Sequence, residues 1–202
     1  HRRRHVMGET KKTAGPAMET DVVQRSLVPQ EELYQLLKKA DLSISVAESC
    51  TGGLLCSRLV SVPGISEFFK EGFVTYSSKA KRKTLEVSKS TLKKQGAVSG
   101  QTAKEMAIGA AMNADTDVAV SVTGNAGPSA EEDKPVGLVY IGIYLSGKVK
   151  AYEYMFEGER DDIRSQAASE AISLCCRALE KYLSKNSEKE RPKEKPEKAD
   201  KH

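Results

Sequence analysis

The chain of 202 residues contains 32 lysines and arginines against 28 aspartates and glutamates, which gives a net charge of +4 at neutral pH. That excess lies at the two ends: residues 1–20 carry a net charge of +3 and residues 184–202 one of +2, so residues 21–183 sum to −1. Because nucleic-acid binding normally needs a basic patch on the folded surface, the charge predicts no nucleic-acid partner.

The composition predicts one folded domain between two disordered ends. Residues 21–183 are long enough to form a domain with a hydrophobic core. Residues 184–202 contain no Val, Ile, Leu, Met or aromatic residue, so we predict a disordered, charged tail there. Residues 1–20 are predicted to be a disordered arm, and its first six residues, HRRRHV, are interpreted as a cloning remnant or an incidental basic segment. No apolar run approaches the roughly 20 residues that span a bilayer, so we expect a cytoplasmic protein without a membrane partner.

The first half of the domain is predicted to alternate helices and strands. PQEELYQLLKKA, residues 29–40, begins with a proline and has leucines at helical spacing, which predicts a helix. LSISVAE, residues 42–48, alternates apolar and polar residues as a strand does. A short helix over residues 53–62, ended by Pro-Gly, and a strand over residues 72–77, GFVTYS, follow.

The second half begins with a long predicted helix over residues 100–113, with Ser99 as its N-cap. Residues 117–122, DVAVSV, form a short apolar run that is typical of a strand covered on both faces. Residues 136–156 predict a hairpin around Ser-Gly, and residues 161–183 carry the clearest helical periodicity in the chain. The order predicts an α/β fold with a mixed, mostly parallel sheet between helix layers and one C-terminal hairpin.

The positions of the histidines limit the chemistry of the folded region. The chain has three, His1, His5 and His202, and none between residues 6 and 201. A Ser-His-Asp triad and the usual imidazole-based zinc site are therefore excluded there. A serine nucleophile would need a lysine, a tyrosine or a carboxylate as its base. We expect neither a metal nor another cofactor.

The stretch SVAESCTGG places Ser49 between a predicted strand and a glycine pair that opens a helix. The serine and glycines are compatible with ordinary turn and capping chemistry. They are also compatible with a nucleophile beside free N–H groups of Gly52 and Gly53 that could bind an anion. Two further segments, TYSSKAK and TGNAGP, are predicted to reach strand ends, where ligands of such sheets collect.

Tyr76 and Lys81 in TYSSKAK are candidates for the missing base. A free lysine has a pKa of about 10.4, so Lys81 would have to be desolvated or lie near another cation. The alternative is that the run containing Lys79 and Lys81 coats a solvated helix face. The Tyr-to-Lys spacing is one residue longer than in short-chain dehydrogenases, and the chain has no G-x-G-x-x-G, so that interpretation fails.

The four cysteines are Cys50, Cys56, Cys175 and Cys176, and none forms a C-x-x-C pair. Without a core histidine to complete a metal set, they are predicted to be reduced thiols. Cys50 lies beside Ser49 and is kept as a competing nucleophile.

Together these motifs carry a family resemblance. Seven of them occur in one order: AESCTGG, PG, FVTYS followed by AK, GAVS, TGNAGP, KPVG and the GER turn. From about Gln30 to Leu183 the sequence resembles the C-terminal domain family of the competence-damage-inducible protein CinA. The enzymatic members of that family are nicotinamide mononucleotide deamidases, also called nicotinamide-nucleotide amidases.

The resemblance implies a three-layer α/β/α domain, often homodimeric. It implies hydrolysis of the carboxamide of nicotinamide mononucleotide, a small-molecule nucleotide, to nicotinate mononucleotide and ammonia. It assigns Ser49 as nucleophile, with Tyr76 and Lys81 as the other catalytic residues. The residues that it places at the substrate are Thr51, Gly52, Gly53, Thr123, Gly124 and Arg160.

Three motifs depart from the family pattern. YSNEAK becomes YSSKAK, which puts Lys79 where the family has an acidic residue; the GIAGPDGG loop becomes GNAGPSAEED; and Gly-Asp-Arg becomes Gly-Glu-Arg. We expect Lys79 or Arg160 to help lower the pKa of Lys81. A nucleotide-binding module of the same fold without catalytic activity is the alternative hypothesis, and only the enzyme would release ammonia in a way that depends on Ser49.

Overall fold

The computed structural model describes residues 27–190. The predictions for residues 1–20 and 191–202 lie outside this range. The helices are α1 (Pro29–Ala40), α2 (Leu54–Val60), η1 (Ile65–Glu67, a 3₁₀ turn), α3 (Ser78–Leu85), α4 (Lys89–Lys94), α5 (Gly100–Ala114) and α6 (Arg160–Glu190). The strands are β1 (Ile44–Glu48), β2 (Phe69–Val74), β3 (Val118–Gly124), β4 (Leu138–Leu145) and β5 (Lys148–Met155).

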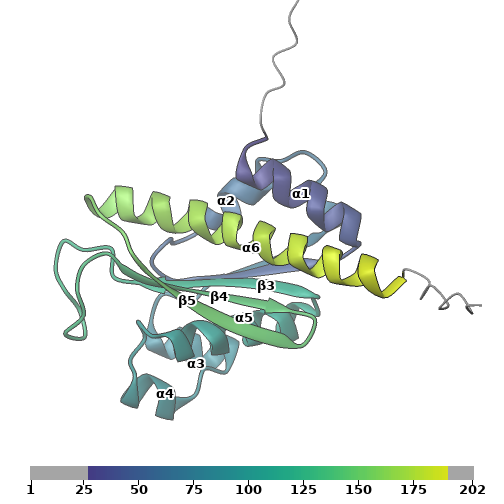
Figure 1. Cartoon of the computed structure of the whole chain (residues 1–202). Helices are drawn as coiled ribbons and strands as arrows, with labels where there is room; N and C mark the ends of the chain where they lie inside the picture. Colours follow the sequence, from purple (N-terminus) through teal and green to yellow (C-terminus); the bar gives the residue numbers. More distant parts are fainter. Residues whose placement is uncertain (1–26, 191–202) are drawn as a thin grey trace, which may run out of the picture.

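The strands form one sheet in the order β2-β1-β3-β4-β5. β1 pairs parallel with β2 and β3, whereas β3–β4 and β4–β5 are antiparallel. Helices α1, α2 and α6 cover one face of the sheet, and α3, α4 and α5 lie on the other (Figure 1). The predicted α/β architecture with a mixed sheet and a C-terminal hairpin is confirmed. The expectation of a mostly parallel sheet is wrong, because two of the four strand pairings are antiparallel.

The two faces of the sheet differ in side-chain size. Ile44, Val46 and Val120 pack in the larger core cluster, together with residues of α1, α2 and α6. Ala47 and Ala119 belong to the smaller cluster under α5. All five residues of β1 are buried, so the alternation in LSISVAE separates large from small side chains rather than core from solvent. The small residues let α5 lie close to the strands.

Most element positions agree with the sequence prediction. α1 spans the predicted residues, and the Ser99 side chain caps α5 by accepting a hydrogen bond from Thr102 N at 3.1 Å. β2 starts at Phe69, three residues before the predicted strand. α3 and α4 have no counterpart among the predicted elements, because their lysine- and serine-rich sequences lack an apolar helical repeat.

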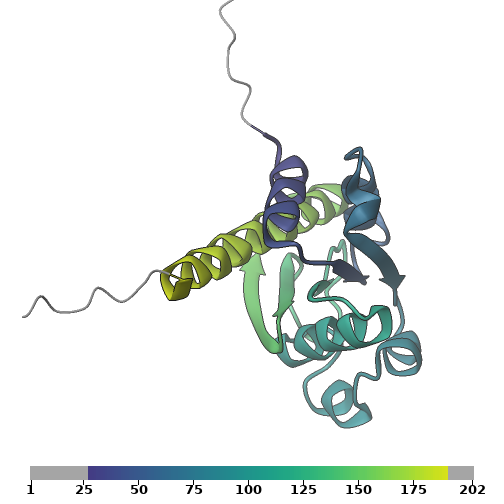
Figure 2. The same ribbon diagram turned by 90° about the vertical axis from the view of Figure 1, so that its right-hand side faces the viewer.

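The last helix is longer than predicted. α6 continues to Glu190, so residues 184–190 are helical and their assignment to a disordered tail is wrong. Figure 2 shows that this end of α6 extends past the edge of the sheet. No residue after Leu179 within the described part of α6 is buried. Good helix formers therefore continue the helix without a core beneath it.

None of the helices in residues 27–190 combines the length and apolarity required to cross a bilayer.

The close contact between α5 and α3 depends on Gly109. A Cβ atom at this position would overlap the backbone carbonyl of Leu85, in the last turn of α3. The contact fixes how near α3 lies to the sheet. Gly100, at the start of the same helix, has room: an added Cβ would lie 3.6 Å from the nearest atom, on Tyr140.

We predict that Gly109→Ala lowers the free energy of unfolding by about 1–3 kcal/mol, because the added methyl group forces α3 away from α5. Denaturant unfolding measures the change. Gly100→Ala is the matched control and should leave stability within about 0.5 kcal/mol, since alanine favours a helix and meets only ordinary contacts there. Equal effects of the two substitutions would contradict this account of the contact.

Candidate active site

The carboxyl ends of β1, β2 and β3 lie at one edge of the sheet, because these neighbouring strands are parallel. Ser49 follows β1 directly, and its N–H donates to Val122 O of β3 at 2.9 Å. The segment with Tyr76 and Lys81 follows β2, and Thr123 and Gly124 end β3. The three segments predicted to meet at strand ends are therefore together.

The structure brings Ser49 and Lys81 into direct contact. Lys81 Nζ lies 2.9 Å from Ser49 Oγ, and both residues are buried, with exposed fractions of 1% and 8%. Lys81 lies on the inner side of α3, whereas Lys79, Arg82 and Lys83 face solvent. The alternative interpretation of the charge run holds for these three residues but not for Lys81.

Two backbone carbonyls complete the surroundings of the Lys81 amine. Thr75 O lies 2.8 Å and Tyr76 O 3.4 Å from Nζ. A neutral amine has two hydrogens and one lone pair, so the carbonyls can accept both hydrogens while the lone pair accepts the hydroxyl hydrogen of Ser49. The arrangement accommodates an uncharged lysine beside a serine that donates.

Burial lowers the pKa of Lys81 from 10.5 to about 8. Charge interactions with Cys50 and Glu132 act weakly in the opposite direction. The expectation that Lys79 or Arg160 would lower this pKa is wrong, because desolvation is the cause. A substantial fraction of the amine is therefore neutral in mildly alkaline solution.

The phenol of Tyr76 lies away from this pair. Its side chain is 61% exposed, and its hydroxyl accepts a hydrogen bond from Arg160 at 3.1 Å. Arg160 also donates to Gly127 O. The hydrogen bonds of the described residues do not join the phenol to Ser49 or Lys81. Tyr76 reaches the lysine through its backbone carbonyl alone, and Tyr76 with Arg160 forms a polar rim at this edge.

The turn after Ser49 uses its glycines for conformation. Gly52 and Gly53 have φ angles of +57° and +99°, which glycine adopts at little cost. Gly52 N–H donates to Ser49 O at 3.1 Å, so it is not free to bind a ligand. Thr51 is fully buried, and its hydroxyl has no partner among the described residues.

Glu48, which precedes Ser49, is a residue of this site that the sequence interpretation missed. It is fully buried, and its carboxylate accepts hydrogen bonds from Leu55 N at 2.8 Å and Cys56 N at 3.1 Å. The carboxylate thus satisfies the N–H groups at the start of α2, which has a glycine N-cap. An acidic residue ending a fully buried strand was the available signal.

Arg164 is the second missed residue. From α6 it donates through Nε to Cys50 O at 3.1 Å and through one terminal nitrogen to Thr51 O at 2.9 Å. No local sequence pattern links residue 164 to this turn, since the contact joins segments more than 110 residues apart.

Thr123 and Gly124 have structural contacts at the same edge. The Thr123 hydroxyl donates to Ala97 O at 2.7 Å and so ties the end of β3 to the turn before α5. A Cβ at Gly124 would collide with the Val139 side chain and with the carbonyl oxygen of Leu138 on β4. The structure thus places both residues beside the site, with the Thr123 side chain buried.

Cys50 is poorly suited to be the nucleophile. It is buried beside Ser49, and burial raises the pKa of its thiol to about 11. Little thiolate is present near neutral pH, and the thiolate is the reactive form.

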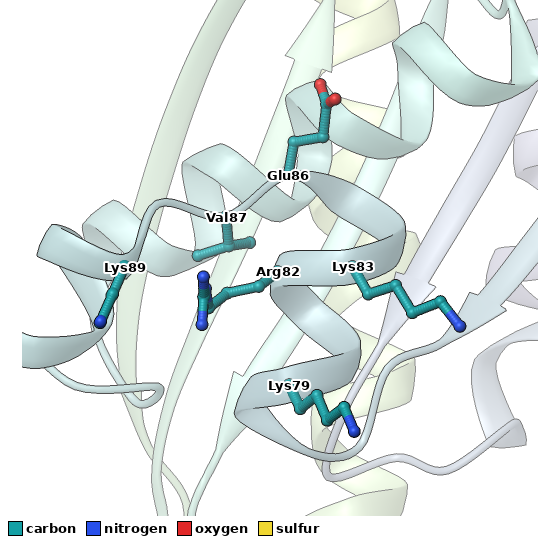
Figure 3. Close-up of a pocket in the computed structure, with 6 residues that line it drawn as sticks. All are labelled: Lys79, Arg82, Lys83, Glu86, Val87 and Lys89. Atoms are coloured by element: carbon teal, nitrogen blue, oxygen red, sulfur yellow. The ribbon is translucent and has the colours of Figure 1, made fainter.

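A surface depression of about 440 Å³ lies on the outer side of α3 and does not include the Ser49–Lys81 pair. In Figure 3 Arg82 and Lys89 lie on one side of α3 and Lys79 and Lys83 on the other, so the four cations do not meet at one point. The lining residues are Lys79, Arg82, Lys83, Glu86, Val87 and Lys89.

Comparison with known proteins identifies the family. The model of the CinA C-terminal domain matches residues 28–179, most of the described chain. The chain belongs to the CinA C-terminal domain family. A CinA-like protein of Kosmotoga olearia is 50% identical over 151 residues, which cover 74% of this chain and 37% of that relative. The chain thus spans little more than a third of the length of this longer CinA-like protein.

Solved CinA superfamily structures share the fold. The protein from Klebsiella pneumoniae superposes with a TM-score of 0.74 at 30% identity, covering 76% of this chain and 96% of that one. The protein from Escherichia coli gives 0.71 at 35% identity, with 75% and 87% covered. The predicted family and fold are therefore confirmed, and the Ser49–Lys81 pair lies in the part of this CinA domain that matches.

The buried lysine should make stability depend on pH. Between pH 8 and 10.5 the unfolded chain holds a proton on Lys81 that the folded CinA domain has released, so the free energy of unfolding rises with pH. Compared with Lys81→Met, the wild type should gain about 3 kcal/mol across this window and nothing below it. Urea unfolding of both proteins from pH 7 to 10.5 measures the difference, and a constant difference would mean that Lys81 titrates normally.

Proposed function

We propose that this CinA domain hydrolyses the carboxamide of nicotinamide mononucleotide to nicotinate mononucleotide and ammonia. Ser49 is the nucleophile and Lys81 its general base. The observation that carries the proposal is the buried contact of 2.9 Å between Lys81 Nζ and Ser49 Oγ. The family resemblance supplies the substrate.

In the first half of the reaction Ser49 Oγ attacks the carbonyl carbon of the carboxamide. The hydroxyl proton passes to the lone pair of Lys81, and the carbonyl oxygen takes the negative charge. When the tetrahedral intermediate collapses, the Lys81 ammonium gives its proton to the departing nitrogen. Ammonia leaves, and an ester joins the nicotinoyl group to Ser49.

In the second half water attacks the ester. Lys81, neutral again, takes a proton from the water and returns it to Ser49 Oγ as the ester bond breaks. The acid product leaves and gives its proton to ammonia in solution, so the net reaction converts the carboxamide and one water into a carboxylate and ammonium. One base thus serves both halves, which needs no histidine.

Arg160 and Tyr76 are the residues we propose for holding the nucleotide. Both are exposed at the rim and bonded to each other. The guanidinium can attract the phosphate of the substrate. We thus propose that Tyr76 takes part in substrate binding rather than in proton transfer. The homodimer and the cytoplasmic location stay predictions from the sequence.

A nucleotide-binding module without catalysis is the second candidate. Two residues that differ from the family motifs, Lys79 and Asn125, favour this candidate. Both lie in segments that follow strands at the edge of the sheet where the site is. It predicts binding of nicotinamide mononucleotide without ammonia release.

Ser49→Ala should lower ammonia release from nicotinamide mononucleotide by at least about 10³-fold, because it removes the attacking oxygen. Cys50→Ala is the neighbouring control and should retain most activity. A coupled ammonia assay measures both variants. Ser49→Ala with more than about a tenth of wild-type turnover would rule out the serine mechanism, and a wild type that binds the nucleotide but releases no ammonia would favour the silent module.

The rate should rise with pH around the lowered pKa of Lys81, about 8, because only the neutral amine can take the proton. Lys81→Met should abolish turnover while ligand binding persists. Lys79→Glu should stay active with the same midpoint, since burial rather than Lys79 lowers the pKa. A pH–rate profile of kcat tests both. An active Lys81→Met together with an inactive Lys79→Met would mean that the wrong lysine has been assigned.

A further inference from the structure

Arg164 connects the start of α6 to the turn that carries Ser49. Its guanidinium donates to two consecutive backbone carbonyls, Cys50 O at 3.1 Å and Thr51 O at 2.9 Å. The remaining terminal nitrogen pairs with Asp161 at 3.2 Å. Three directions of the planar group are thus occupied, so its orientation is well defined.

The peptide group between Thr51 and Gly52 links Arg164 to Ser49. In a trans peptide the C=O and N–H point in opposite directions. The carbonyl of Thr51 points to Arg164, and the N–H of the same peptide, on Gly52, donates to Ser49 O at 3.1 Å. Arg164, this peptide and the Ser49 carbonyl form one chain of hydrogen bonds.

The turn needs such a restraint because of its composition. Gly52 and Gly53 have positive φ angles and no side chains to hold them. The Glu48 carboxylate fixes the start of α2 beyond the turn, at Leu55 and Cys56. Within residues 27–190, Arg164 is the side chain that hydrogen-bonds to the backbone of residues 50–52.

We propose that Arg164 is a positioning residue: by holding the carbonyls of Cys50 and Thr51 it keeps Ser49 Oγ in hydrogen-bond contact with Lys81 Nζ. The inference rests on the proposed serine mechanism. It does not place Arg164 in contact with substrate. A displacement of about 1 Å at a reacting atom can cost on the order of 10²-fold in rate.

Arg58 offers a matched control for this role. It also links α2 to α6, donating to Ser165 O at 3.0 Å and to the hydroxyls of Ser165 and Ser169. It makes no hydrogen bond to the turn of residues 49–53. Loss of Arg58 therefore removes a comparable set of hydrogen bonds to α6, from α2 instead of from the turn, without releasing Ser49.

The test compares wild type, Arg164→Met, Arg164→Lys and Arg58→Met in two assays. One measures kcat and KM for ammonia release from nicotinamide mononucleotide. The other measures the rate at which a fluorophosphonate labels Ser49, where Oγ bonds to phosphorus, fluoride leaves and the proton passes to Lys81. The second assay reads the reactivity of Ser49 whatever the natural substrate is.

Arg164→Met should lower kcat and the labelling rate about 10- to 100-fold while KM changes less than about threefold. The pH–rate midpoint near 8 should not move, because Arg164 does not contribute to the pKa of Lys81. Arg164→Lys should recover part of the rate, since one ammonium can reach one carbonyl. Arg58→Met should stay within about twofold of wild type in both assays.

Labelling of Arg164→Met at the wild-type rate would overturn the inference, as would an equal loss in Arg58→Met, which would indicate general loosening of α6. A wild type that is labelled at Ser49 but releases no ammonia would instead refute the proposed substrate. The labelling rates would still decide the role of Arg164.

Discussion

A lysine amine that is buried away from water has a lower pKa than one on the surface. The chemistry proposed at this sheet edge depends on that lowered pKa at Lys81. Its amine is buried against Ser49 Oγ and the carbonyl of Thr75. Desolvation favours the neutral form, and the Ser49 hydroxyl with the carbonyls of Thr75 and Tyr76 leaves that form fully hydrogen-bonded. The same interaction orients the Ser49 hydroxyl. Burial of Lys81 and its contact with Ser49 thus supply a base and an oriented nucleophile without a histidine.

The position of that amine depends on packing elsewhere. α3 carries Lys81 on its inner side and is held at its last turn by α5, where Gly109 meets the carbonyl of Leu85. α5 in turn lies close to the sheet because Ala47 and Ala119 present small side chains to it. A larger residue at any of these positions would move α3 outward. The distance from Lys81 to Ser49 therefore depends on packing at positions outside the Ser49–Lys81 pair.

α6 supplies the other side of the edge. Arg160 and Arg164 lie one turn apart at its start, and each binds a different segment. Arg160 reaches Tyr76 and Gly127, while Arg164 holds the carbonyls after Ser49. One helix end thus ties together loops that follow three different strands. The last turns of α6 extend beyond the sheet, and its described part has no buried residue after Leu179.

Local sequence patterns were sufficient to predict most elements and the family, and to make Ser49 and Lys81 candidates for the site. Helical and strand periods are local, so α1 and the C-terminal hairpin could be predicted from neighbouring residues. The absence of core histidines and the motif order were sufficient to select Ser49 and Lys81. Which lysine of the cationic run is buried could be seen only in the folded protein. The sequence of α3 lacks an apolar repeat that would show which face of the helix packs against the core.

Contacts between segments that are distant in the sequence could likewise not be predicted from local patterns. Arg164 reaches the carbonyls of Cys50 and Thr51 through hydrogen bonds that form only when α6 packs beside the turn after β1. Tyr76 was a candidate catalytic residue, but its phenol is exposed at the rim and accepts a hydrogen bond from Arg160. The cause of the lowered pKa of Lys81 is also tertiary: charge can be counted along a chain, whereas desolvation depends on which groups fold around the amine.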